Sequence, residues 1–170
     1  VLGARGHHVE EAEIFYDAAY PETFSTVWTG GLAAAPIPAG SEAKLGTLAR
    51  SFRERATDRD LKTSVAAARR LTEIAADFRT QWGRYDVVLT PAMAFTPPAI
   101  GFYTSQDADT DYMRQCQYTP YTSMVNVSGL PAITVPTFTT ANGLSMGVQL
   151  IGRAGSESQL LALAQQLSEM

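Results

Sequence analysis

Apolar residues recur at three- and four-residue steps through the middle of the chain. They are Leu61, Val65, Ala68, Leu71, Ile74, Ala75, Phe78 and Trp82. This spacing places them on one face of an amphipathic helix. Thr57 with Asp60 is typical of a capping box, and Gly83 supplies a stop. The pattern predicts a long helix over residues 58–82, whose apolar face needs a sheet or another helix to cover it.

Shorter patterns predict a sheet. Residues 86–91, DVVLTP, form a brief apolar run that ends at proline, which is typical of a strand buried on both faces. Residues 132–138 and 144–151 flank a turn that contains Asn142 and Gly143. The second run alternates Leu144, Met146, Val148 and Leu150 with Ser145, Gly147, Gln149 and Ile151. We expect an antiparallel pair here, and an α/β fold in which helices flank a mixed β-sheet.

Three further elements are expected near the ends. Residues 7–15 suit a strand, and residues 21–32 suit a short helix that opens with Pro21 at an early position. Residues 156–159, SESQ, form a capping box for a last helix. Its apolar face carries Leu160, Leu163, Ala164 and Leu167. That face predicts a helix that packs back on the sheet.

Residues 91–111 contain three prolines and read as an irregular loop at a strand's end. Its aromatic residues are Phe95, Phe102 and Tyr103, and α/β proteins tend to build sites in such loops. Residues 33–43 are rich in Ala, Pro and Gly, yet we place no domain boundary there. The sequence is therefore interpreted as one domain over residues 1–170.

Composition and charge limit the classes of partner. The chain has 170 residues, 45% hydrophobic and 18% charged, which is enough for one sizeable core. A net charge of -4 and a pI near 5.1 argue against a nucleic-acid partner. No apolar run approaches the roughly 20 residues that cross a bilayer, so no membrane partner is expected. The single cysteine, Cys116, rules out an internal disulfide, and without signal-peptide features the expected location is cytoplasmic.

No residue shows catalytic context by itself. His7 and His8, if in a strand, point to opposite faces and cannot jointly hold a metal. Cys116 lacks a neighbouring base and is expected to be a small buried hydrophobe. Ser123 and Ser128 lack a GxSxG elbow, so we expect them to cap helices. The acidic pairs at 10–11 and 58/60 suit a solvated face, and no metal or cofactor is expected.

Three blocks of sequence resemble a known family. They are YDVVLTPAMAFTPPAIG, YTPYTSMVNVSGLPAITVP and GLSMGVQLIGRAGSESQLLALAQQL, in that order. They are similar to consecutive blocks from the C-terminal part of the amidase signature family of hydrolases. The match in order and spacing runs over residues 45–167, and residues 1–15 resemble the stretch that precedes them. The resemblance implies the C-terminal part of the amidase signature fold.

The family's chemistry implies a catalytic triad that this chain lacks. The triad comprises a serine nucleophile, a second serine in a cis peptide bond and a lysine that serves as acid and base. The resemblance places all three upstream, the serines in a Gly/Ser-rich segment that nothing here matches. Lys44 and Lys62 also lack that context. No catalytic residue is therefore assigned to this chain, which alone is predicted to be inactive.

The resemblance instead implies a pocket wall. The expected substrate-binding residues are Phe95, Thr119, Tyr121, Thr122 and Met124, with Asn126 in the same helix and turn leading Pro131 into the sheet. The alternative is structural: Tyr121 and Met124 are core, while Thr122 and Asn126 cap backbone. A branch that transfers ammonia on tRNA has an acidic residue near the position of Thr119. The neutral residue here favours a neutral, aromatic or aliphatic, carboxamide.

Two hypotheses follow. The chain is the C-terminal portion of an amidohydrolase, whose partners are a small-molecule amide and an upstream catalytic segment, with a possible homodimer. Alternatively, it is a non-catalytic binding domain or a degenerate paralogue. The first residue is Val1, which fits either a part of a longer chain or a chain whose start methionine was removed. Isolated, the chain would leave strand edges unpaired and is expected to associate.

Overall fold

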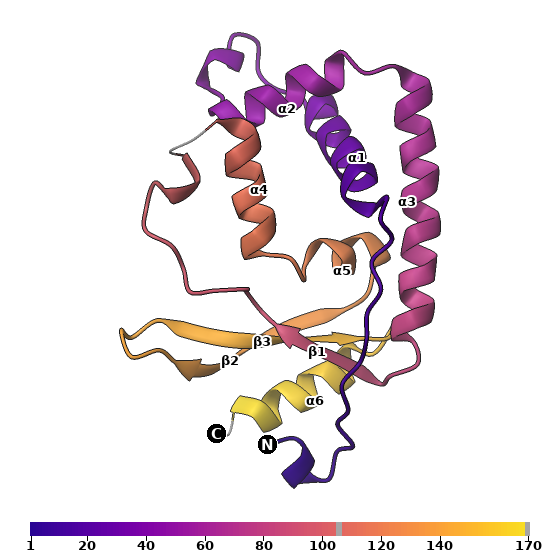
Figure 1. Ribbon diagram of the computed structural model, residues 1–170, viewed down its shortest axis with the longest axis vertical. Coiled ribbons are helices and arrows are strands. Elements are labelled where there is room, and N and C mark those ends of the chain that lie inside the picture. The colour runs from indigo at the N-terminus through magenta and orange to yellow at the C-terminus, as the bar shows by residue number, and fades with distance from the viewer. Residues whose placement is uncertain (105–106, 169–170) are drawn as a thin grey trace. The chain divides into compact units, whose positions relative to one another are not determined.

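The computed structural model describes residues 1–104 and 107–168. The chain divides into two compact units. The sheet unit comprises Val1–Phe15, Ala75–Pro97 and Tyr118–Met170, and the helical unit comprises Tyr16–Ile74 and Pro98–Gln117. One boundary falls inside the long helix α3 (Leu61–Trp82), which is continuous through both (Figure 1).

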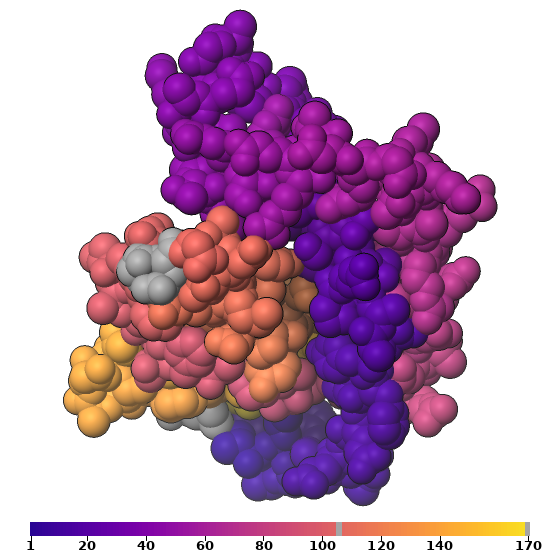
Figure 2. Space-filling model, turned by 45° about the horizontal axis from the view of Figure 1, so that its top comes forward, coloured from indigo at the N-terminus to yellow at the C-terminus, as the bar shows by residue number. Residues whose placement is uncertain are grey.

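Three strands form the sheet: β1 (Val87–Pro91), β2 (Ala132–Thr139) and β3 (Ser145–Gly152), in the order β1-β3-β2. Both pairings are antiparallel. The predicted pair of β2 and β3 is therefore confirmed, and Gly143 turns the chain at a φ of 82°. This turn lies at the surface in the space-filling view (orange to yellow in Figure 2). With its flanking helices, the chain confirms the predicted α/β class.

The first strand differs from its prediction. Val88 and Thr90 are buried, but Leu89 is 47% exposed, so β1 is covered on one face only within the described chain. Leu89 pairs with Leu150 and shares its face of the sheet, but it is not among the side chains packed in or against the core that contains Leu150. The apolar run DVVLTP indicated a strand correctly, but the expectation of burial on both faces was wrong.

Helix α6 (Glu157–Ser168) covers one face of the sheet, as predicted. Its core with the strands consists of Val135, Leu150, Leu160, Ala164 and Leu167. Gly152 permits this close approach, because a Cβ there would lie 2.1 Å from Ser156 Oγ. Side chains of opposite phase on the strands face away from α6, toward the side where helix α5 (Ser123–Ser128) lies (Figure 1).

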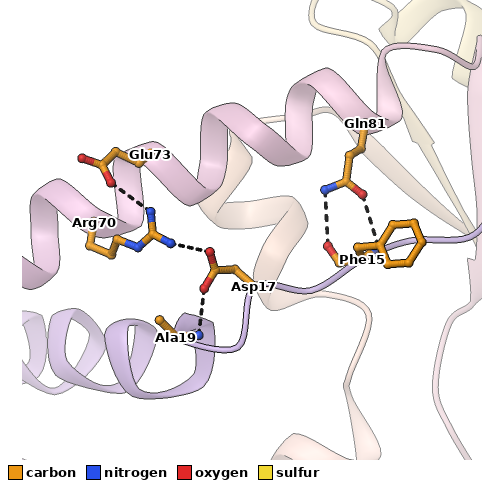
Figure 3. Close-up of polar contacts among 6 residues, drawn as sticks. All are labelled: Phe15, Asp17, Ala19, Arg70, Glu73 and Gln81. Carbon is orange, nitrogen blue, oxygen red and sulfur yellow. Dashed lines mark hydrogen bonds and ion pairs between the residues drawn. The ribbon is translucent and has the colours of Figure 1, made fainter.

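The N-terminal segment is not the strand predicted over residues 7–15. It has no strand pairing, and side chains hold it instead. His7 Nε2 is 2.8 Å from Gln166 Oε1 in α6. The Gln81 side chain accepts from the Phe15 N–H at 3.2 Å and donates to the Phe15 carbonyl at 3.3 Å (Figure 3). A side-chain amide thus supplies the donor and acceptor that a neighbouring strand would otherwise offer.

The helical unit contains α1 (Tyr20–Ala34), α2 (Thr47–Thr57), the first part of α3 and α4 (Ala108–Tyr118). Short 3-10 turns at Gly3–Arg5, Glu42–Lys44 and Phe102–Thr104 complete the described elements. The helix predicted over residues 21–32 is confirmed as α1. Asp17, just before α1, forms an ion pair with Arg70, which also contacts Glu73 at 3.0 Å (Figure 3).

The long helix starts later than predicted. Thr57 is the last residue of α2, and its hydroxyl donates to the Arg53 carbonyl. Asp60 caps α3 instead: its Oδ1 accepts from the Thr63 N–H at 2.9 Å, and its Oδ2 accepts from the Thr63 hydroxyl at 2.6 Å. These hydrogen bonds from Thr63 lower the pKa of Asp60 below its usual value. The predicted end at Trp82, before Gly83, is confirmed.

Candidate functional site

The five predicted wall residues all lie in the sheet unit. Phe95 follows β1, whereas Thr119, Tyr121, Thr122 and Met124 lie between the end of α4 and the first turn of α5. Two contacts join these segments. The Ala94 N–H donates to the Tyr118 carbonyl at 3.0 Å, and the rings of Phe95 and Tyr118 lie 5.0 Å apart. The loop after β1 therefore meets the turn of residues 118–122.

Exposure separates these five residues. Phe95 is 39% exposed, and Thr119, Tyr121 and Thr122 are half-buried. Met124 is fully buried at 0% exposure. Among the described residues, the side chain of Met124 therefore packs in the core.

The side chains of Thr122 and Asn126 hydrogen-bond to backbone. The Thr122 hydroxyl donates to the Thr119 carbonyl at 3.3 Å. The Asn126 amide donates to the Thr122 carbonyl at 3.2 Å. These contacts match the structural alternative for Thr122 and Asn126. They also fix the backbone of the turn that carries Tyr121.

Gln149 contacts the turn that carries Tyr121, and the sequence pattern did not single it out. It lies on β3, is 5% exposed, and donates from Nε2 to Thr90 Oγ1 at 3.2 Å and to the Tyr121 carbonyl at 3.1 Å. A signal for its burial exists in the sequence. Ile151 shares the phase of Gln149 on β3, so this face of the strand is not wholly polar.

No nucleophile paired with a base emerges among the described residues. Lys44 and Lys62 are both exposed. His7 and His8 have different partners, Gln166 and Glu10. No cluster of three or more His, Cys, Asp or Glu side chains within the described ranges could hold a metal ion.

Two expectations for single residues were wrong. Cys116 is exposed rather than buried, because it lies on a surface of α4. Its neighbour Tyr112 has a pKa raised above the usual value, first by burial and then by Cys116 itself. Ser128 does not cap through its side chain: its hydroxyl is buried and has no hydrogen-bond partner among the described residues. The Ser128 carbonyl accepts from Arg79 at 3.1 Å.

A separate hollow of about 490 Å³ lies in the helical unit. It is lined by Glu42, Ala43, Leu45, Arg50, Arg53, Glu54, Thr57 and Asp58. Its arginines are engaged with backbone: Arg50 donates to the carbonyls of Ala43 and Leu45, and Arg53 to those of Leu32 and Ala35. These contacts hold the Ala- and Pro-rich residues 33–43 within one unit.

Within the described ranges, every helix is too short or too polar to span a lipid bilayer.

The chain shares its fold with part of two larger solved structures. The structure of 6-aminohexanoate cyclic dimer hydrolase complexed with substrate superposes with a TM-score of 0.85 at 23% identity. The superposition covers 99% of this chain and 38% of that chain. A second solved structure, of an amidase, gives a TM-score of 0.79 at 18% identity. The likeness shows a shared fold that this chain fills in part.

Sequence comparison gives the family. The amidase family model matches residues 9–161, and the chain belongs to this family. AmiC of Mycobacterium leprae (strain TN), whose name assigns it provisionally to the amidases, is 34% identical over 180 residues. AmiB2 of Mycobacterium bovis (strain ATCC BAA-935 / AF2122/97), which is named in the same way, is 40% identical over 103 residues. The chain spans 38% of the length of AmiC, and its match with AmiB2 covers 59% of this chain and 22% of AmiB2.

Proposed function

We propose that this chain is the C-terminal portion of an amidohydrolase that cleaves carboxamide C–N bonds through a serine acyl-enzyme. One observation carries the proposal: the chain aligns with AmiC over 99% of its own length but covers 38% of that protein. The catalytic serines and lysine then belong to an upstream segment of the same enzyme. The chain contributes sheet, helices and one wall of the substrate pocket.

The exposure of the lysines supports this division. A lysine serves as a base near neutral pH only where burial and hydrogen bonding disfavour its charged form. Lys44 and Lys62, the two lysines of the sequence, are both exposed. Within the described chain they lack the desolvation that such a base requires, which supports a base on another segment.

The chemistry of the wall favours a neutral substrate. Phe95, Thr119, Tyr121, Thr122 and Met124 are all uncharged. The paired rings of Phe95 and Tyr118 offer aromatic surface to an apolar acyl group. We therefore propose a small aromatic or aliphatic carboxamide as substrate, with Met124 supporting the wall from within the core.

The wall is tested in the protein that contains this chain together with its upstream segment. Phe95→Ala should raise KM for an apolar carboxamide roughly tenfold, because apolar contact is lost, with a smaller change in kcat. Phe138→Ala is the matched control, since Phe138 is an exposed phenylalanine on β2 outside the proposed wall. Equal KM values for Phe95→Ala and Phe138→Ala would show that Phe95 does not belong to the wall.

The division between segments has its own test. Residues 1–170 alone should hydrolyse no carboxamide, whereas the same assay on the longer protein should show turnover. Turnover by residues 1–170 alone would contradict the proposal that the catalytic residues lie elsewhere. An inactive longer protein with an intact fold would instead favour a binding role.

A further inference from the structure

We propose that Gln149 is a positioning residue that fixes the turn of residues 118–122 against the sheet and thereby sets the shape of the pocket wall. Its effect on the turn stands on hydrogen bonding alone. Its effect on substrate rests on the proposed function. We place Gln149 away from the reacting atoms, and it acts through the backbone of Tyr121.

The strand register brings the three partners together. Thr90 on β1 and Gln149 on β3 are directly opposed, so their side chains lie on the same face of the sheet. This face is opposite the one that α6 covers, because Leu150, the next residue, lies in the core with α6. Both Thr90 and Gln149 are buried, at 8% and 5% exposure. Their polar groups therefore need partners within the protein.

Gln149 is the donor in both of its hydrogen bonds, and Thr90 passes the chain on by donating to Pro91. The Thr90 hydroxyl donates its proton to the Pro91 carbonyl at 3.1 Å, so its oxygen is free to accept. The Gln149 amide carries two protons, and its Nε2 donates to Thr90 Oγ1 and to the Tyr121 carbonyl. Both amide protons are thus used. A carboxylate at this position would face two acceptors with no proton to give.

The turn is anchored at both ends. The Tyr118 carbonyl accepts from the Ala94 N–H in the loop after β1, and the Tyr121 carbonyl accepts from Gln149. Between these anchors lie Thr119 and Pro120, and proline offers no N–H of its own. Since Tyr121 precedes α5, its carbonyl depends on a side chain for this contact. Removal of the Gln149 donor should release the turn.

Hydrogen–deuterium exchange in the longer protein tests this directly. Gln149→Glu keeps the shape of the side chain and replaces its donor, and Gln149→Met removes the donor without a buried charge. The N–H groups of Ala94 and Asn126 donate to the turn, at the carbonyls of Tyr118 and Thr122, and report its exchange. We expect their exchange to quicken roughly tenfold in both variants. Strands β2 and β3 should keep the exchange rates of the parent protein.

Thr134→Val is the control, because Thr134 is an exposed residue directly opposite Gln149 on β2. It should leave exchange in the turn unchanged. Unchanged exchange in the turn of the Gln149→Met variant would overturn the proposal. A uniform rise through the whole sheet unit would also overturn it, since that is the result of general destabilisation.

Kinetics separate this proposal from the proposed function. If the turn forms the pocket wall, Gln149→Met should raise KM several-fold more than it lowers kcat. Faster exchange confined to the turn, with unchanged KM, would show that Gln149 anchors the turn but that the turn does not form the pocket wall. If exchange in the turn stays as slow as in the parent protein while KM rises, Gln149 does not anchor the turn. The pocket wall would then be formed by other residues.

Discussion

At the scale of single residues, Gly147 shows how closely β2 and β3 approach each other. A Cβ at this position would lie 2.3 Å from the Val135 carbonyl oxygen and 3.1 Å from Pro136 Cα. Both contacts are with backbone, which cannot rotate away as a side chain can. The strand register is irregular next to this site, between Pro136 and Phe138. Only glycine fits without a shift of the strands.

Gly147→Ala should therefore lower the free energy of unfolding by roughly 1–3 kcal/mol, as expected for overpacking. Urea unfolding followed by fluorescence of Trp82, which is buried in the same unit, would measure the change. Gly3→Ala is the control, because no atom lies within 4 Å of its added Cβ, and it should change stability by less than about 0.5 kcal/mol. Equal stability of the two variants would contradict the steric argument.

Residue roles were the least predictable part of the sequence. A capping signal at the start of α3 was visible, but the cap is Asp60 and not Thr57. A lone cysteine suits a core by its chemistry, yet Cys116 is exposed. Both outcomes depend on where neighbouring segments pass, which residue type alone does not fix.

At the scale of elements, α6 illustrates a helix whose sequence pattern was sufficient. Leu160 is 2% exposed and lies in the core with Val135 and Leu150, whereas Leu161 is 62% exposed. These adjacent leucines point in different directions from the helix axis because residues one apart do not share a face. The period of the pattern therefore identified the buried face before any tertiary contact was known.

Leu160→Ala should destabilise the protein by about 2–5 kcal/mol, because it removes buried methyl groups and leaves a cavity. Leu161→Ala removes the same atoms from an exposed site and should cost less than about 0.5 kcal/mol. Thermal and urea unfolding of the two variants provide the comparison. A similar loss in both would show that α6 does not pack on the sheet as described.

Helices α2 and α4 have 11 residues each and were not predicted. The only buried side chain of α2 is Phe52, and those of α4 are Ala108 and Asp111. Contacts between the two helices compensate: the rings of Phe52 and Tyr112 meet edge to face at 5.0 Å, and Arg55 pairs with Asp109 at 2.5 Å. Such partners lie far apart in the sequence, so the residues of either helix alone do not reveal them.

At the scale of the whole molecule, the isolated chain should associate. The described sheet has three strands, so β1 and β2 each present an unpaired edge. Leu89 on β1 is 47% exposed and adds apolar surface beside one of these edges. Light scattering of purified residues 1–170 should show particles larger than a monomer. Leu89→Lys places a charge on that edge and should reduce association, whereas a monomer at every concentration would contradict this prediction.

The sequence by itself determined the family, the α/β class, the course of α3, the β2–β3 hairpin and the buried face of α6. These features arise from periods, turns and caps that act within a few residues, or from blocks long enough to be recognised. The tertiary structure decided which face of β1 is exposed, why residues 7–15 are no strand, and what Gln149 does. His7 meets Gln166 across 159 positions, and Gln149 meets Thr90 across 59. Local patterns cannot specify such partners, because the folded chain alone brings them within hydrogen-bonding distance.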